Sequence, residues 1–130
     1  MKSYRQLFHL AALVLIMLLP TAHAQVPAAH AVAGITIVIP LSAKGSSRAE
    51  SVAAMRDIAA FVARQPGLID AVLMENNNPA NTPSHVHVTR WFKLGDWEAL
   101  FSNPEFKELA RRHQARVSVA DGTAIFTPLK

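Results

Sequence analysis

The sequence contains no cysteine and no apolar run long enough to cross a membrane. Without cysteine, the chain can form no disulfide scaffold, carry no lipid on a cysteine and use no thiol chemistry, so a hydrophobic core must stabilise it. A membrane-spanning helix needs about 20 apolar residues, whereas the apolar run Leu10–Leu19 ends at Pro20. These absences favour a small domain that is stabilised by its own core.

The first 24 residues have the three-part pattern of an export signal. Lys2 and Arg5 provide positive charge, the apolar run follows, and Ala22-His23-Ala24 places small residues at the two positions that a signal peptidase reads. We therefore expect cleavage after Ala24 and a working protein outside the cytoplasm, periplasmic in a Gram-negative host and otherwise secreted. After cleavage we expect no association with the membrane.

Removal of this signal changes the charge balance. The whole chain has a formal net charge of +4, but Lys2 and Arg5 leave with the signal, so 11 Lys and Arg remain against 9 Asp and Glu. A net charge of about +2 gives little reason to expect a nucleic-acid partner. We interpret the Ala-rich residues 25–34 as a flexible leader and residues 35–130 as a single domain.

Apolar periodicity predicts four strands and two helical regions in this domain. Ser47 and Glu50 have the form of a capping box, Pro66-Gly67 ends the first helix, and Asn103-Pro104 begins the last. In chain order, the predicted elements are a strand over Ile35–Ile39 that Pro40 stops, a helix from Ser47 to about Arg64, strands over Leu68–Glu75 and His85–Phe92, a short helix over Trp97–Phe101 capped by Gly95-Asp96, a helix from Asn103, and a strand over Ala124–Leu129.

The order of these elements predicts an α+β, ferredoxin-like βαββαβ fold, in which a four-stranded antiparallel sheet carries both helices on one face. The second strand has apolar residues on both of its sides, namely Leu68, Val72 and Met74 on one and Ile69, Ala71 and Leu73 on the other. A sheet face exposed to water would alternate more cleanly between apolar and polar residues. We therefore expect a second copy of the chain to cover the face that the helices leave bare.

Four short segments carry a family resemblance by their order and separations. They are Gln65-Pro66-Gly67-Leu68, Thr89-Arg90-Trp91, Trp97-Glu98-Ala99-Leu100 and Ser102-Asn103-Pro104-Glu105-Phe106. Over Ile35–Leu129 the chain resembles the antibiotic-biosynthesis-monooxygenase type of domain in the dimeric α/β-barrel superfamily. The resemblance implies a homodimer with its two sheets packed face to face and, in each protomer, a cavity between the helices and the sheet.

Enzymes of this family oxidise planar aromatic or quinol substrates with dioxygen and without metal or flavin, so the resemblance implies no cofactor. In them an Asn and a Trp four residues apart line the cavity, and His87 and Trp91 have that spacing here. We take these two as candidate catalytic residues, because a neutral imidazole can accept a phenol proton. Phe106 and His113 are candidate cavity residues. A related branch cleaves haem, but the helix His of that branch falls at Ala110.

The same residues are also compatible with structural or metal-binding roles. Trp91 can end its strand as a packing residue, Trp97 is expected to pack its helix, and His113 can stabilise the carbonyl end of its helix dipole. His85 and His87 project from one strand face as candidate metal ligands, although most metal sites use three or four protein ligands. Three functions remain open: an exported monooxygenase-like domain that binds a small planar aromatic or quinone-type molecule, a non-catalytic ligand-binding or dimerisation module, and a metal binder.

Overall fold

The structure is a computed structural model that describes residues 34–45, 47–78 and 80–129. The chain divides into two units, residues 1–30 and 31–130, and all described residues belong to the second unit. The predicted signal at 1–24 and leader residues 25–33 therefore lie outside the described residues. No helix in the described part is long and apolar enough to span a membrane.

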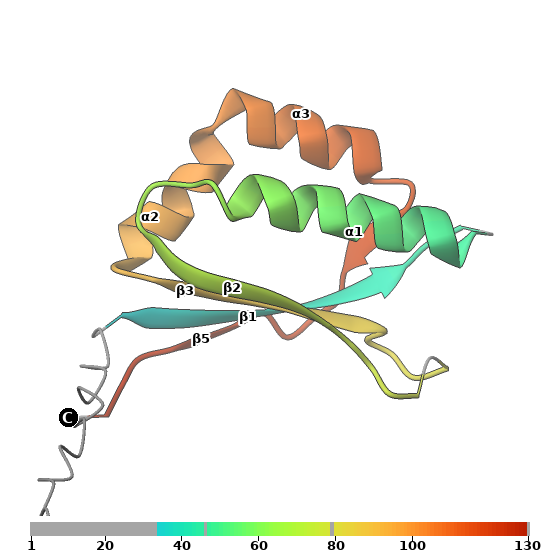
Figure 1. Ribbon diagram of the computed structural model, residues 1–130, viewed down its shortest axis with the longest axis horizontal. Helices are drawn as coiled ribbons and strands as arrows, with labels where there is room; N and C mark the ends of the chain where they lie inside the picture. The colour runs from blue at the N-terminus through green and yellow to red at the C-terminus, as the bar shows by residue number, and fades with distance from the viewer. Residues whose placement is uncertain (1–33, 46, 79, 130) are drawn as a thin grey trace, which may run out of the picture. The chain divides into compact units, whose positions relative to one another are not determined.

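The described elements form one antiparallel sheet with helices over one of its faces (Figure 1). In chain order they are β1 (Ile35–Ala43), α1 (Arg48–Val62), β2 (Leu68–Glu75), β3 (His85–Trp91), α2 (Leu94–Glu98), η1 (Ala99–Ser102), α3 (Pro104–His113), β4 (Val117–Val119) and β5 (Ala124–Phe126). The strand order is β2-β3-β1-β4, and β5 also pairs with β1. The predicted α+β, ferredoxin-like arrangement is confirmed, with five strands in the described residues in place of four, of which β4 and β5 are short.

The core lies between the sheet and the helices. Alternate residues of β1 face the helices, and in the pairing with β3, Ile37 lies opposite Thr89. Ile37 and Trp91 are fully buried, and they join a buried cluster with Phe61, Val62, Leu100 and Leu109. Burial of a large apolar side chain stabilises a protein by about 1.5–3 kcal/mol, so this cluster holds the helices against the sheet.

The two long helices begin where the sequence predicts. The Ser47 hydroxyl caps α1 by accepting a hydrogen bond from the Glu50 N–H at 3.3 Å. The Asn103 side chain caps α3, accepting from the Glu105 N–H at 2.8 Å, with Pro104 in the first turn. The predicted Gly95-Asp96 cap of the short helix is wrong, because α2 already begins at Leu94 after an extended Lys93.

Pro40 lies within β1 and does not end it, so the predicted end of the first strand is wrong. The Pro40 carbonyl accepts from the Ala120 N–H at 2.9 Å, on the side of the fourth strand. In a strand, the N–H and C=O of one residue point in the same direction. An N–H at position 40, which proline lacks, would therefore also point toward the fourth strand. The fourth strand is interrupted there, so β1 passes Pro40 without losing a ladder hydrogen bond.

The fourth strand consists of two pieces, and only the second of them, β5, overlaps the predicted Ala124–Leu129 strand. The piece β4 pairs with residues 41–43 of β1, and β5 pairs with residues 36–38. The sequence prediction therefore missed β4 and extended β5 beyond Phe126, where the pairing ends. The edge of the sheet beside β1 is consequently broken over residues 120–123, between the two pieces.

Strand β2 has the predicted bounds but contains a register shift between Leu68 and Asp70. Leu68 lies opposite Trp91 and packs against the core, whereas Asp70 faces the other side of the sheet. The prediction that Leu68 shares a face with Val72 and Met74 is therefore wrong. An extra residue in one strand reverses the alternation of side chains on either side of it.

The sheet face away from the helices is mainly apolar, and it also carries the Arg90–Asp70 ion pair. Val72 lies opposite Val88, which in turn lies opposite Val38 of β1. Val72, Met74 and Phe126 are 49%, 46% and 54% exposed. Large apolar side chains exposed together on one face are typical of an interaction site.

The turn between α1 and β2 depends on a glycine. Gly67 has a φ of +82°, and an added Cβ would collide with the Asp96 side chain. We expect Gly67→Ala to lower the free energy of unfolding by about 1–2 kcal/mol, measured by urea unfolding. Gly95→Ala is the matched control, because an added Cβ there meets nothing within 4 Å. Equal losses from the two substitutions would contradict this account of Gly67.

Candidate functional site

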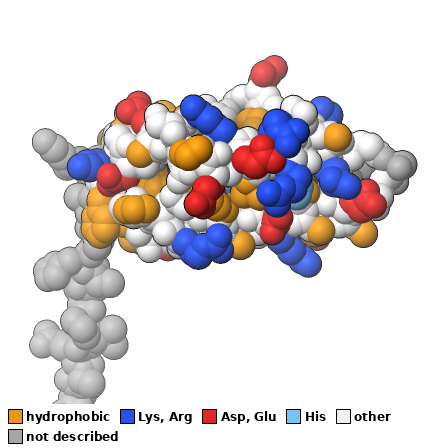
Figure 2. All heavy atoms as spheres, turned by 90° about the horizontal axis from the view of Figure 1, so that it is seen from above, with side chains coloured by type: hydrophobic (Ala, Val, Ile, Leu, Met, Phe, Trp, Pro, Cys, Tyr) orange, Lys and Arg blue, Asp and Glu red, His pale blue; other side chains and the backbone are white. Residues whose placement is uncertain are grey.

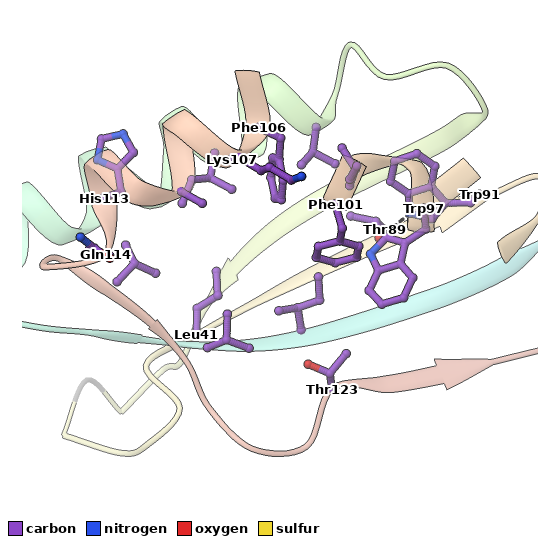
Figure 3. A pocket seen from close by; sticks show the side chains of 17 residues that line it. Leu41, Thr89, Trp91, Trp97, Phe101, Phe106, Lys107, His113, Gln114 and Thr123 are labelled. Carbon is purple, nitrogen blue, oxygen red and sulfur yellow. Dashed lines mark hydrogen bonds between the residues drawn. The ribbon is translucent and has the colours of Figure 1, made fainter. Parts of the chain in front are cut away.

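A cavity of about 720 Å³ lies between the helices and the sheet (Figure 3). Its walls come from β1, β3, β4, α1, α2, η1 and α3. This is the position that the family resemblance implied. Cavities of about 300–1,000 Å³ are typical of small-molecule sites, so the space suffices for a ligand with two or three fused rings.

The cavity has a buried floor and an exposed mouth. Trp91, Leu100 and Leu41 are among the buried lining residues. The exposed lining residues are Phe101 of η1, Lys107, Ala110 and Gln114 in and after α3, and Val119 and Thr123 of the fourth-strand region. The mouth therefore lies between α3 and the broken fourth strand.

Trp91 is both a packing residue and a lining residue. It is fully buried, and its indole N–H donates to the Thr89 hydroxyl at 2.8 Å. This hydrogen bond fixes the orientation of the ring and satisfies its one polar atom. Trp91 therefore presents an apolar surface to the cavity, and its N–H is already engaged.

Aromatic rings form one wall. Phe101 meets Trp97 edge-on with 5.0 Å between the ring centroids, and it meets Phe106 in the same way at 6.0 Å. Phe106 lines the cavity, as the sequence analysis predicts. Trp97 lines the cavity too, beyond the helix-packing role expected for it, so both tryptophans of the chain lie at this site.

His87 is buried on the same strand face as Thr89 and Trp91 but does not line the cavity. It is 3% exposed, and its Nε2 atom has no hydrogen-bond partner among the described residues. Burial lowers the pKa of His87 below its ordinary value of 6.5, because the charged imidazolium is poorly solvated there. Its catalytic role stays a prediction, although His87 is not among the residues that line the cavity.

His85 shares that face with His87, as the alternation predicts. Its Nδ1 atom lies 2.9 Å from the Ser84 hydroxyl, and its Nε2 atom lies 3.9 Å from a Glu75 carboxylate oxygen. Burial lowers the pKa of His85, and the positive charges of two arginines, Arg48 and Arg56, lower it further. Within residues 34–45, 47–78 and 80–129, no group of three or more His, Cys, Asp and Glu is arranged to hold a metal.

His113 lines the cavity at the end of α3 but is engaged with α1. Its Nε2 atom lies 2.9 Å from a carboxylate oxygen of Asp57, and it is 9% exposed. In Figure 3 its ring points away from Leu41 and the sheet. His113 therefore links the two long helices through its Nε2 atom, and its buried Nδ1 atom has no hydrogen-bond partner among the described residues.

Sequence reasoning missed several lining residues for identifiable reasons. Lys107, Ala110 and Gln114 fall at helical spacing of three and four, so they could have been found by extending the face that contains Phe106. Val119 could not have been found, because the sequence pattern places the fourth strand later in the chain. Its position depends on the interruption of that strand beside Pro40.

Comparison with solved structures supports the assignment of the fold. The chain is similar to SnoaB, a cofactor-independent oxygenase from Streptomyces nogalater, with 23% identity, a TM-score of 0.63, and coverage of 75% of this chain and 95% of SnoaB. It is also similar to a putative antibiotic biosynthesis monooxygenase from Chloroflexus aurantiacus, with 14% identity, a TM-score of 0.59, and coverage of 75% and 94%.

A third similar structure is a dimeric protein of ferredoxin-like fold from Bacteroides fragilis, with 12% identity, a TM-score of 0.57, and coverage of 72% of this chain and 95% of that one. Neither a protein-family model nor a curated protein matches the sequence. At these identities the similarity establishes the fold. The chain has an α+β, ferredoxin-like fold, similar to the structures of SnoaB and of the putative antibiotic biosynthesis monooxygenase.

The two buried histidines predict a pH dependence of stability. The folded state lowers the pKa values of His85 and His87, so the unfolded state binds more protons as the pH falls through 6.5. Their stabilising contribution is complete above pH 6.5 and is lost below it. We expect the free energy of unfolding, measured in urea, to fall between pH 7.5 and pH 5. His87→Gln should reduce the slope, and an unchanged slope would show that His87 is not the cause.

Proposed function

We propose that the protein is an exported, dimeric domain whose cavity binds a small planar aromatic or quinone-type molecule and oxidises it with dioxygen, without metal or flavin. The observation that carries this proposal is the 720 Å³ cavity with Trp91, Trp97 and Phe106 in its walls. Aromatic side chains favour stacked and edge-on contacts with other rings. The similarity to SnoaB, a cofactor-independent oxygenase, supports the same class of function.

The proposed chemistry requires only the substrate and dioxygen. A phenol or an activated ring methylene loses a proton, and the electron-rich carbon that results reduces dioxygen. One oxygen atom enters the substrate as a carbonyl in place of two hydrogens, and the other leaves as water. A cavity that excludes water strengthens the interactions that hold the substrate and protects reactive intermediates from side reactions.

One observation favours the alternative, a module that binds the ligand without chemistry. The Trp91 N–H is already donated to Thr89, and the Nε2 atom of His113 is held by Asp57, which leaves only the Nδ1 atom of His113 without a partner among these groups in the described residues. A general base must lie within hydrogen-bond reach of the proton that it removes. His87 is the predicted base, and it reaches a substrate only if the neighbouring side chains move.

A homodimer is the assembly that the open sheet face supports best. That face exposes Val72, Met74 and Phe126, and β1 and β3 add Val38 and Val88 to the same surface. The similar protein from Bacteroides fragilis is dimeric. Two copies packed through this face would bury an apolar surface that one copy leaves in water, and the cavities would remain accessible on the helix sides.

Oxygen consumption tests the catalytic proposal. We expect the purified protein to consume dioxygen with at least one compound of a quinol and anthrone panel, measured with an oxygen electrode. Trp91→Phe should lower the rate at least about tenfold by loosening the substrate position, whereas the exposed neighbour variant Phe92→Ala should retain it. Tryptophan quenching by the same compounds without oxygen uptake would overturn the catalytic proposal and support the binding module.

The same assay tests His87. If its imidazole is the base, His87→Gln should lower the rate by about 10²-fold or more while quenching by the ligand is unchanged. A variant with the activity of the wild-type protein would show that the prediction for His87 is wrong. Circular dichroism checks that each variant is folded.

Mass measurement in solution tests the dimer. We expect light scattering after gel filtration to give the mass of two chains, and we expect Met74→Asp to give one, because burying a carboxylate in an apolar interface strongly opposes association. Ala60→Asp, on the exposed side of α1, is the control and should remain dimeric. A wild-type protein with the mass of a single chain would contradict the proposed assembly.

A further inference from the structure

We infer that the ligand of the cavity is an acid, namely a planar aromatic molecule with an anionic substituent that pairs with Lys107 at the mouth. This inference rests on the proposed function and adds the charge of the ligand to it. Lys107 is one of the exposed lining residues on α3 (Figure 3). An anion bound there would have its ring system inside the cavity and its charge at the opening.

The charge distribution of the lining favours an anion. Lys107 is the one lining residue with a permanent charge, and no Asp or Glu lies among the described residues of the lining. The other exposed polar groups at the mouth are the Gln114 amide and the Thr123 hydroxyl, which can donate hydrogen bonds. A cationic ligand would meet a like charge without a compensating carboxylate.

Lys107 is also unpaired within the part of the chain that the structure describes. The positions three and four residues away on the helix surface, where an ion-pair partner would lie, hold no carboxylate. They are Asn103, Pro104, Ala110 and Arg111. Arg111 forms its own pair with Glu108 at 2.7 Å. The ammonium group is therefore available to a ligand.

The position of Lys107 differs from that of an ordinary solvated lysine. On the helix side of the molecule, basic and acidic side chains are interspersed (Figure 2), and the Arg111–Glu108 pair is an example from α3. Lys107 instead shares a helix face with Ala110 and Gln114, and all three line the cavity. Its aliphatic stem can cover the apolar lining while its amino group stays at the mouth.

The test compares two probes that differ only in charge: anthraquinone-2-carboxylate and anthraquinone-2-carboxamide. Binding is followed by quenching of tryptophan fluorescence, which reports on this cavity because Trp91 and Trp97 both line it and are the only tryptophans in the chain. We expect the carboxylate to bind about fivefold more tightly than the amide, the scale of a partly exposed ion pair. Added salt should reduce that preference.

Three variants of the full-length chain identify the residue that causes the preference for the carboxylate probe. Lys107→Met should abolish the preference for the carboxylate without weakening binding of the amide, and Lys107→Arg should retain it. Arg112 is a nearby basic residue that does not line the cavity, so Arg112→Met should also retain the preference for the carboxylate. Equal binding of the two probes by the wild-type protein, or a preference that survives in Lys107→Met, would overturn the inference. If neither probe quenches, the proposed function itself fails.

Discussion

The burial of Trp91 at the end of β3 is the interaction on which the rest of this structure depends. Its ring belongs to the hydrophobic core and forms part of the cavity floor at the same time. The hydrogen bond from its indole to Thr89 holds the ring in one orientation. Leu100 and Val62 share this double role. Folding and ligand binding therefore use the same side chains, so a change that enlarges the cavity also removes part of the core.

A second constraint is the proline within β1. Pro40 offers no N–H toward the fourth strand, and the sheet edge beside it is broken between β4 and β5, so β1 accommodates the proline there. The mouth of the cavity lies between this broken edge and α3, and Val119, just before the break, and Thr123, within it, contribute to the mouth.

The sequence predicted the parts of the fold that local chemistry determines. Ser47 and Asn103 cap their helices as expected, since capping depends on one side chain and the next few residues. The split strand beside Pro40 and the register shift at Leu68 were not predicted, because they depend on pairing with strands far away in the chain. The alternation on β3 correctly placed Trp91 on the face toward the cavity. It could not show that His87, on the same face, lies outside the cavity lining, because the extent of the cavity depends on packing with distant elements.

The central claim is that a planar aromatic ligand occupies the cavity between the helices and the sheet. Nuclear magnetic resonance of the labelled protein with anthraquinone-2-carboxylate tests it most directly, through nuclear Overhauser contacts between ligand and protein protons. Our account predicts contacts from the ligand to the rings of Trp91, Trp97 and Phe106. Contacts only to the methyl groups of Val72 and Val88, on the opposite sheet face, would contradict it.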